Sequence, residues 1–350
     1  MPVDVHFDKC VAGCHRRLVR LAARGVNVKK LKSDIPRAAD LSREEFVNEY
    51  LKPHQPVVLT EATKSWNAIG KWSLDHLAET HRDHTVLVER YPTQSRSNAY
   101  TYVEMTVNEY IETVRASEKN RKTYYLADTA LETTLPQLTN DVVKPAFIPS
   151  DSSVRTGLFL GHDTFSAAHY HRKRCQALLC QITGVKEVLL YPARHTKYLY
   201  PHAWYGLRPN FSQIDMEFEN RNDSFDEYPD FDKAETYYCE LKPGESLFIP
   251  DHWMHTVTGL EDNASLTYFW DESISHCFLP GLFRDYAAHV SKSTLITLAR
   301  ASKMVGLHKS MLEVAIQMGI VPRSEEEAVL QHFEEFGGQL PNTVKSSQQA

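Results

Sequence analysis

The sequence predicts a mainly β fold, a sandwich or barrel of short strands, with helices before and after it. Between residues 155 and 270, short apolar segments alternate with turns, which is typical of a sandwich or barrel. On both sides of this region, apolar residues recur at helical spacing. A pair of histidines, His169 and His171, and a distant His255 indicate a metal site held inside a small barrel.

Composition limits the class of protein. The chain has 350 residues, 24% of them charged and 42% hydrophobic, which is ordinary for a soluble globular protein. Its net charge of −6 excludes a generally basic nucleic-acid binder. We expect no membrane span and no signal peptide, and therefore a cytoplasmic protein. The six cysteines form no Cys-x2-Cys pair, so we expect reduced thiols and no zinc site of that kind.

The chain is expected to contain one main domain with segments at either end. A basic helix is predicted in residues 1–34, where helical spacing separates apolar from basic groups, and we expect it to dock on its own domain as a solvated face. Residues 35–275 are predicted to form the barrel and its N-terminal helical wrap. Residues 276–344 are predicted to be helical, packing within the chain or forming a homodimer, and the polar residues 345–350 to be disordered.

Individual elements before the barrel follow from caps and periodicity. Ser42 is placed to cap a helix whose apolar face carries Phe46, Tyr50 and Leu51. Further helices are predicted from Ser73 and over residues 105–117, and strands over residues 56–60, 85–90 and 122–127.

Seven short strands are predicted within the barrel region, over residues 157–160, 177–182, 186–191, 237–240, 246–249, 256–257 and 265–270. A long insert, residues 202–235, contains nine acidic residues and three Lys or Arg. Insertions of this length are often lids or binding loops, although a solvated loop is the simpler interpretation.

The histidine pair has a geometric basis. Alternate residues of a β-strand point to the same face, so His169 and His171 would aim into one space. An isolated His-x-His motif is weak evidence of a metal site, and the interpretation depends on the rest of the chain.

The late motif at residues 242–255, Lys-Pro-Gly-Glu-Ser-Leu-Phe-Ile-Pro-Asp-His-Trp-Met-His, resembles that of the JmjC, or cupin-like, 2-oxoglutarate oxygenases. The resemblance spans residues 35–275, and the texture is similar to that of small hydroxylases related to factor inhibiting hypoxia-inducible factor. The supporting segments are His169-Tyr-His171, Gln181, Gly184-Val-Lys186, Pro56-Val-Val-Leu, Trp72, Tyr125-Leu-Ala-Asp and Leu135-Pro-Gln-Leu.

The resemblance implies a double-stranded β-helix that uses Fe(II) and 2-oxoglutarate. It assigns iron to His169, His171 and His255, and the far carboxylate of 2-oxoglutarate to Lys186, Tyr125 and Ser166. A lysine in an apolar strand is costly to bury unless it is paired, so we expect Lys186 to have an anionic partner. A surface lysine on an edge strand is the alternative.

The sequence departs from the family at the second ligand, where His171 replaces an acid. The commoner spacing to Gln181 and Lys186 would make His171 the first ligand and put Lys173 in place of the acid. We favour His169 as first ligand, with two residues inserted before Ala177, which occupies the place of the usual asparagine. We also expect His252 to be exposed, and Tyr268 and Trp270 to close the barrel floor beside the site.

The function implied by the resemblance is hydroxylation of a protein or peptide side chain. A small-molecule substrate remains open, and a nucleic-acid partner is disfavoured. Two rivals are a three-histidine cupin dioxygenase that does not use 2-oxoglutarate, against which Lys186 argues, and an inactive binding or scaffold module, for which His171 and Lys173 argue.

Overall fold

The computed structural model describes residues 31–39, 41–91, 100–149, 154–202, 208–214, 216 and 227–278, together with 280, 281 and 285. The chain divides into two compact units, residues 1–283 and 284–350, and the barrel lies in the first. The predicted basic helix is outside the described residues except for Leu31–Asp34, which form strand β1 instead. The helices predicted after residue 278 and the tail lie almost wholly outside them, and the domain bounds stay predictions.

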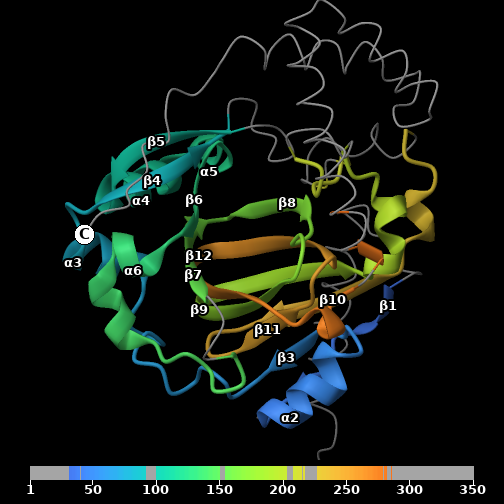
Figure 1. Cartoon of the computed structure of the whole chain (residues 1–350). Helices are drawn as coiled ribbons and strands as arrows, with labels where there is room; N and C mark the ends of the chain where they lie inside the picture. The colour runs from blue at the N-terminus through green and yellow to red at the C-terminus, as the bar shows by residue number, and fades with distance from the viewer. Residues whose placement is uncertain are drawn as a thin grey trace, which may run out of the picture. The chain divides into compact units, whose positions relative to one another are not determined.

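The described strands form one connected sheet system (Figure 1) in the order β2-β3-β11-β9-β12-β7-β6-β4-β5, with β1 on β10, β10 on β9, and β8 on β12. After β1, the strands are β2 (Arg37–Ala38), β3 (Val57–Leu59), β4 (Thr85–Arg90), β5 (Thr101–Thr106), β6 (Tyr124–Thr129), β7 (Arg155–His162), β8 (Phe165–His169), β9 (Cys175–Tyr191), β10 (Thr236–Leu241), β11 (Ser246–Ile249) and β12 (Met254–Asp271).

Two long strands, β9 and β12, close the barrel because each belongs to two layers. The first part of β9 pairs with β11 and the second with β10. The first part of β12 pairs with β8 and the second with β7. β9 turns at Gly184, whose φ of +72° favours glycine and where a Cβ would lie 2.1 Å from the Asp262 carbonyl oxygen. Strands that pass from one layer to the other form the predicted double-stranded β-helix.

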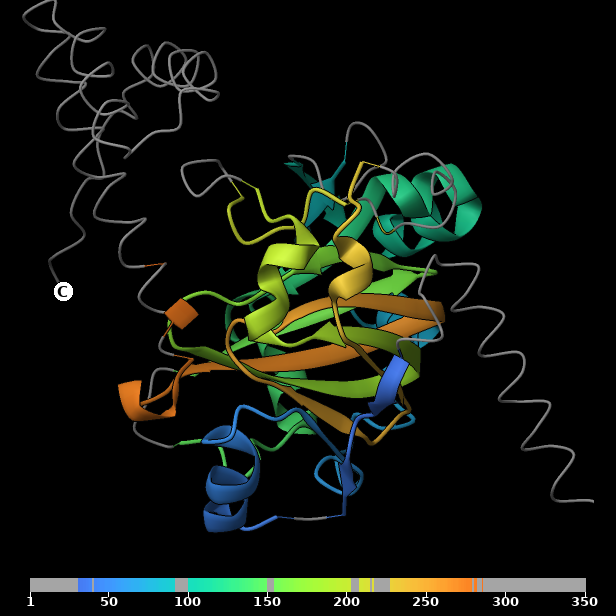
Figure 2. The ribbon, with the colours of Figure 1, turned by 90° about the vertical axis from the view of Figure 1, so that its right-hand side faces the viewer.

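Helical segments cover the outside of the strands. They are α2 (Arg43–Glu45), the π-helix Phe46–Leu51, α3 (Leu74–Thr80), α4 (Val107–Ala116), α5 (Glu118–Thr123) and α6 (Leu131–Thr134), with 3-10 turns at Pro136–Asp141, Ala193–Leu199, Phe231–Lys233 and Ile274–His276. Ser42 and Thr106 each form a capping box with the glutamate three residues later. Figure 2 shows the blue segment with α2 and the teal helices α4 and α5 on opposite sides of the strands.

Alternation along the strands divides the apolar residues among three clusters. Leu178 and Cys180 face outward onto the helices, in the cluster with Phe46 and Trp72. Ala177 and Leu179 face the other way, and their cluster contains residues of both layers, including Leu190, Leu241 and Val257. This second cluster is therefore the interior of the barrel. A third cluster, which includes Leu189 and Tyr191, covers the opposite face of the second layer.

The structure corrects three details of the predicted elements. Met105 lies in strand β5 and Lys122 in helix α5, where a helix and a strand were predicted respectively. Tyr268 and Trp270 lie in the outer cluster with the helices, so they do not form a floor beside the site. Their neighbour Phe269 points the opposite way, as alternation requires, and belongs to the interior cluster.

No helix in the part of the chain that the structure describes is long and apolar enough to cross a membrane.

Candidate functional site

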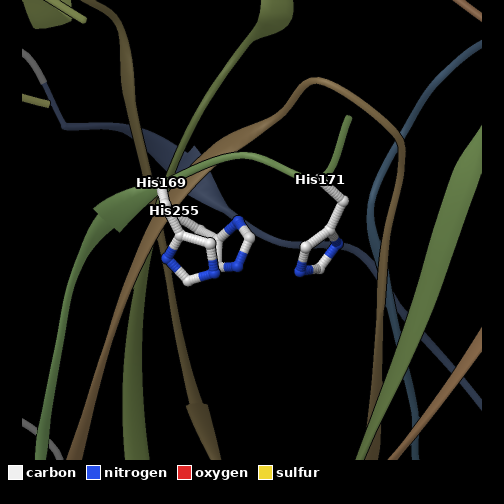
Figure 3. Close-up of side chains that lie close together, drawn as sticks. All are labelled: His169, His171 and His255. Carbon is white, nitrogen blue, oxygen red and sulfur yellow. The ribbon is translucent and has the colours of Figure 1, made fainter. Parts of the chain in front are cut away.

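The three predicted histidines lie close together (Figure 3). His169 is the last residue of β8, and its register partner in β12 is His255. His171 follows two residues later, beyond the end of β8, and its carbonyl oxygen accepts the His252 backbone N–H at 3.1 Å. One ligand atom from each ring lies within 4.8 Å of the other two. The sequence therefore brings three nitrogen donors to one point from two segments far apart in the chain.

Hydrogen bonds preset two of the rings for metal binding. Nδ1 of His169 lies 2.9 Å from the Ala167 carbonyl oxygen, and Nδ1 of His255 lies 2.9 Å from the Trp253 carbonyl oxygen. A carbonyl only accepts, so each Nδ1 carries the proton and each Nε2 keeps its lone pair. Nδ1 of His171 is buried and has no hydrogen-bond partner among the described residues. The third ring thus lacks the hydrogen bond that orients the other two.

Burial also keeps the imidazoles neutral. Loss of solvent lowers the pKa of His169 to about 4 and that of His255 to about 3. Burial, together with the other two histidines, holds the pKa of His171 well below its ordinary value. Neutral imidazole is the form that binds a divalent metal.

A cavity of about 240 Å³ opens against His169 and His171. Its wall is largely aromatic, and it includes Tyr125 and Ser166, the two residues whose hydroxyl groups were predicted to bind 2-oxoglutarate. Its charged lining residues are Glu89, Asp128, Arg155 and Arg208. An aromatic cavity with a few polar groups is the usual form of a small-molecule or side-chain site.

Lys186 is buried in the barrel with 2% of its surface exposed, which excludes a surface lysine on an edge strand. Its Nζ donates to Ser265 Oγ and lies 5.5 Å from the centre of the Phe159 ring, which lines the cavity. The expected anionic partner is absent from the described side chains. Burial lowers the Lys186 pKa to about 7. A buried lysine with no acid beside it fits an anion that arrives from outside the chain.

The three imidazoles suit an Fe(II) ion, because nitrogen donors bind this metal well. His169, His171 and His255 would hold the metal. Tyr125 and Ser166 lie in the cavity wall, and Lys186 lies behind Phe159. The geometry brings the three histidines together and puts Tyr125 and Ser166 in the cavity wall, whereas Lys186 is not among the described residues that line the cavity. The individual ligand roles stay predictions.

Residues 42–276 match the family described as a cupin-like domain, which is about two thirds of the chain. The chain belongs to the cupin-like JmjC oxygenase family. The cofactors of this family are Fe(II) and 2-oxoglutarate.

Curated relatives cover the same region. Lysine-specific demethylase 8 of Xenopus tropicalis is 31% identical over 243 residues, which are 67% of this chain and 52% of that protein. The Danio rerio demethylase of the same name is 31% identical over 248 residues, 68% of this chain and 58% of that protein. The tRNA wybutosine-synthesizing protein 5 of Mus musculus is 24% identical over 266 residues, 70% of this chain and 80% of that protein. The chain thus spans little more than half the length of the two demethylases.

The structure bears on the unusual spacing of the histidines. Lys173 is exposed and lies in the turn between β8 and β9, with a φ of +62°. The cluster in the described residues is formed by His169, His171 and His255, and His169 is the register partner of His255 in the β8–β12 pair. The choice of His169 as first ligand stays a prediction.

His252 was predicted to be exposed, and this prediction was wrong. Only 1% of its surface is exposed, and its Nδ1 lies 2.9 Å from a carboxylate oxygen of Asp251. Asp251 is fully buried and also accepts hydrogen bonds from the Gln176 side chain and the Phe278 backbone N–H. The motif Pro-Asp-His-Trp thus fixes the turn before β12, because Asp251 and His252 are buried there and hydrogen-bonded to each other.

Several cavity residues were missed by sequence reasoning. Phe269 and Arg155 lie on opposite strands as register partners, and both line the cavity. Ser265, which accepts a hydrogen bond from Lys186, lies on β12. Because alternate residues of a strand point to the same face, Phe269 shares the face of Ser265, and this alternation could have indicated it. Arg208 and Phe211 come from the long insert, which places Phe211 beside His169 with ring centres 5.0 Å apart. The insert therefore forms part of the cavity wall with a basic and an aromatic residue, and none of those of its acids that the structure describes lines the cavity.

Proposed function

We propose that the protein is an Fe(II)- and 2-oxoglutarate-dependent dioxygenase that hydroxylates a protein or peptide side chain. Membership of the family supports the cofactors, and the cluster of three histidines supports the metal site. The observation that carries the proposal is Lys186, a lysine buried inside the barrel without an acid beside it among the described residues. A three-histidine cupin that does not use 2-oxoglutarate would have no need of such a cation.

Each group has a task in this reaction. Bound Fe(II) and 2-oxoglutarate supply the activation of O2 that converts a C–H bond to C–OH. Lys186 would neutralise the far carboxylate of 2-oxoglutarate, with Tyr125 and Ser166 donating hydrogen bonds to it. The aromatic wall would exclude water from the metal and bring the substrate carbon to it. His169, His171 and His255 would hold the metal.

The cavity of about 240 Å³ also has to hold 2-oxoglutarate, so we infer the substrate class from the relatives and not from its volume. Relatives named as lysine-specific demethylases agree with a protein substrate, and the relative named for tRNA wybutosine synthesis makes nucleic acid the second class to test. The net charge of −6 disfavours nucleic acid. A cytoplasmic location and a homodimer through the C-terminal helices stay predictions.

A second candidate, a binding module without catalysis, is favoured by one observation. His171 stands in place of the family's acid, and its Nδ1 has no partner among the described residues. A neutral ligand leaves more positive charge on the metal site than a carboxylate would.

The decisive experiment is anaerobic titration of the metal-free protein with Fe(II) and then with 2-oxoglutarate, followed by visible absorption. A metal-to-ligand charge-transfer band that appears only with both supports the proposal. Lys186→Met should bind Fe(II) and lose the band, whereas Lys64→Met, which removes an exposed lysine, should retain it. Iron binding without a band in the wild type favours the 2-oxoglutarate-independent dioxygenase. Absence of iron binding favours the binding module.

The substrate class is then tested with peptide and RNA libraries under O2, scored by mass spectrometry for the gain of one oxygen atom. Oxygen gain in RNA alone contradicts a protein substrate. Loss of a methyl group instead of stable oxygen gain contradicts hydroxylation as the net reaction.

A further inference from the structure

The three candidate ligands are not held in the same way. His169 and His255 each donate Nδ1–H to a backbone carbonyl oxygen at 2.9 Å, which is how a protein usually orients a metal-binding histidine. His171 lacks this bond, since its buried Nδ1 has no partner in the described part of the chain. It also lies beyond the end of β8, where a hydrogen bond from the His252 backbone N–H to its carbonyl oxygen holds the backbone but does not orient the side chain. Another contact must therefore orient the ring.

An aromatic ring occupies the required place. Phe269 and His171 have ring centres 5.3 Å apart and planes at 84°, an edge-to-face contact. Phe269 lies on β12, the same strand as His255, and belongs to the packed interior of the barrel. The position of its ring is thus determined by the strand that supplies another ligand.

Arg155 clamps the same ring from the neighbouring strand. Its guanidinium carbon lies 4.0 Å from the centre of the Phe269 ring, within cation–π range, and the two residues are register partners in the β7–β12 pair. Nη1 of Arg155 donates to Asp128, whose φ of +50° is uncommon for a residue with a side chain. Gly157 leaves room for this carboxylate, since a Cβ there would lie 2.3 Å from Asp128 Oδ1.

We propose that Phe269 and Arg155 are positioning residues for His171, and that this stack replaces the missing hydrogen bond of the third ligand. The inference rests on the proposed metal-ligand role of His171. Removing either member should free the His171 ring to rotate away from the other two donors. Metal affinity should then fall by about tenfold, the lower end of what loss of an orienting partner costs a metal site.

The test measures Co(II) binding to the metal-free full-length protein by calorimetry and by the visible d–d spectrum, so it does not depend on activity. Phe269→Leu keeps an apolar side chain and removes the ring, and Arg155→Met keeps the chain length and removes the charge. Both should weaken Co(II) binding about tenfold and change the ligand-field spectrum. Phe211→Leu is the matched control. It removes the ring stacked on His169, which keeps its own hydrogen bond, so the affinity should change less than threefold.

A double-mutant cycle separates positioning from general damage. In the His171→Ala background, Phe269→Leu should cost no further affinity, because the ring that it orients is gone. The inference is overturned if Phe269→Leu reduces Co(II) affinity equally in the wild-type and His171→Ala backgrounds. It is also overturned if Phe269→Leu and Arg155→Met each keep the wild-type affinity and spectrum. If the wild-type protein binds no Co(II), or His171→Ala binds it as tightly as the wild type, the proposed ligand set fails first. That outcome is distinguishable from failure of the positioning role alone.

Discussion

Lys186 allows a quantitative prediction, because its charge should depend on whether 2-oxoglutarate is bound. Burial lowers its pKa from 10.5 to about 7, so at pH 8.5 only about 3% of the molecules carry a charged Lys186 before the ligand binds. A carboxylate beside Nζ restores the charged form. Binding of 2-oxoglutarate at pH 8.5 should therefore take up about one proton per site from the buffer.

The assay is isothermal titration of Mn(II)-loaded protein with 2-oxoglutarate in buffers of different ionisation enthalpy, whose slope gives the number of protons. Lys186→Met should reduce the uptake to near zero, and Lys64→Met should not change it. An uptake near zero in the wild type refutes the assignment of Lys186 to the ligand carboxylate. At pH 6, where Lys186 is already charged, wild-type uptake should also be small.

The same pKa shift has a consequence for stability. About 3.5 pKa units correspond to ~5 kcal/mol of unfavourable burial of the charged form. The unfolded chain binds the proton up to about pH 10.5, whereas the folded chain releases it above about pH 7. The free energy of unfolding contributed by Lys186 should therefore rise with pH over this window, and Lys186→Met should lack the rise. Urea unfolding of the metal-free proteins at pH 6, 8 and 9.5 measures it, and parallel pH curves for the two proteins would contradict it.

Three further predictions concern the metal site and its support. His171→Asp should tighten Fe(II) binding by about tenfold, or ~1.4 kcal/mol, in a competition titration, and weaker binding would count against His171 as a ligand. The pKa values of His169 and His255 are lower in the folded protein than in the unfolded chain. On acidification the unfolded chain therefore takes up protons before the folded protein does, and the metal-free protein should lose stability between pH 6.5 and about 4. His169→Ala should reduce that loss by ~3 kcal/mol, and an unchanged acid unfolding curve would exclude the buried state of this ring. Gly157→Ala, which drives a Cβ into Asp128, should cost about 1–3 kcal/mol in denaturant unfolding, and a neutral effect would show that this turn yields easily.

The fold was largely predictable because it depends on strong local patterns. Ser42 caps its helix as expected, β4 and β11 have the predicted bounds, and alternation in β9 assigns Ala177 and Leu178 to opposite faces. The errors arose where local preferences conflict with tertiary pairing. Met105 has good helix propensity, yet it pairs with Val86 in β4. Periodicity also did not reveal that two predicted strands join into β9, because the bend at Gly184 resembles a turn.

The residues of the candidate site were largely predictable from the sequence, whereas the residues that surround and position them were less so. His169, His171 and His255 meet, Tyr125 and Ser166 line the cavity, and burial of Lys186 follows from its apolar neighbours. The prediction for His252 failed because a turn position usually means exposure, whereas Asp251 is buried beside it. Phe211 and Arg208 could not have been placed, because a long insert carries no periodicity that says where it returns. Residues 169 and 171 were predicted to share a strand face, but β8 ends between them.

The register between His169 and His255 has a consequence for how the protein matures. These partners are 86 positions apart (255 − 169), and Phe269 lies farther along still. Pairing over such separations forms late in folding, since the loss of chain entropy precedes the gain in contacts. No fragment that ends before β12 can therefore hold all three donors. Tight metal binding should therefore require that β12 has paired with β8. An incompletely folded or truncated chain would then not bind iron tightly in an incomplete site.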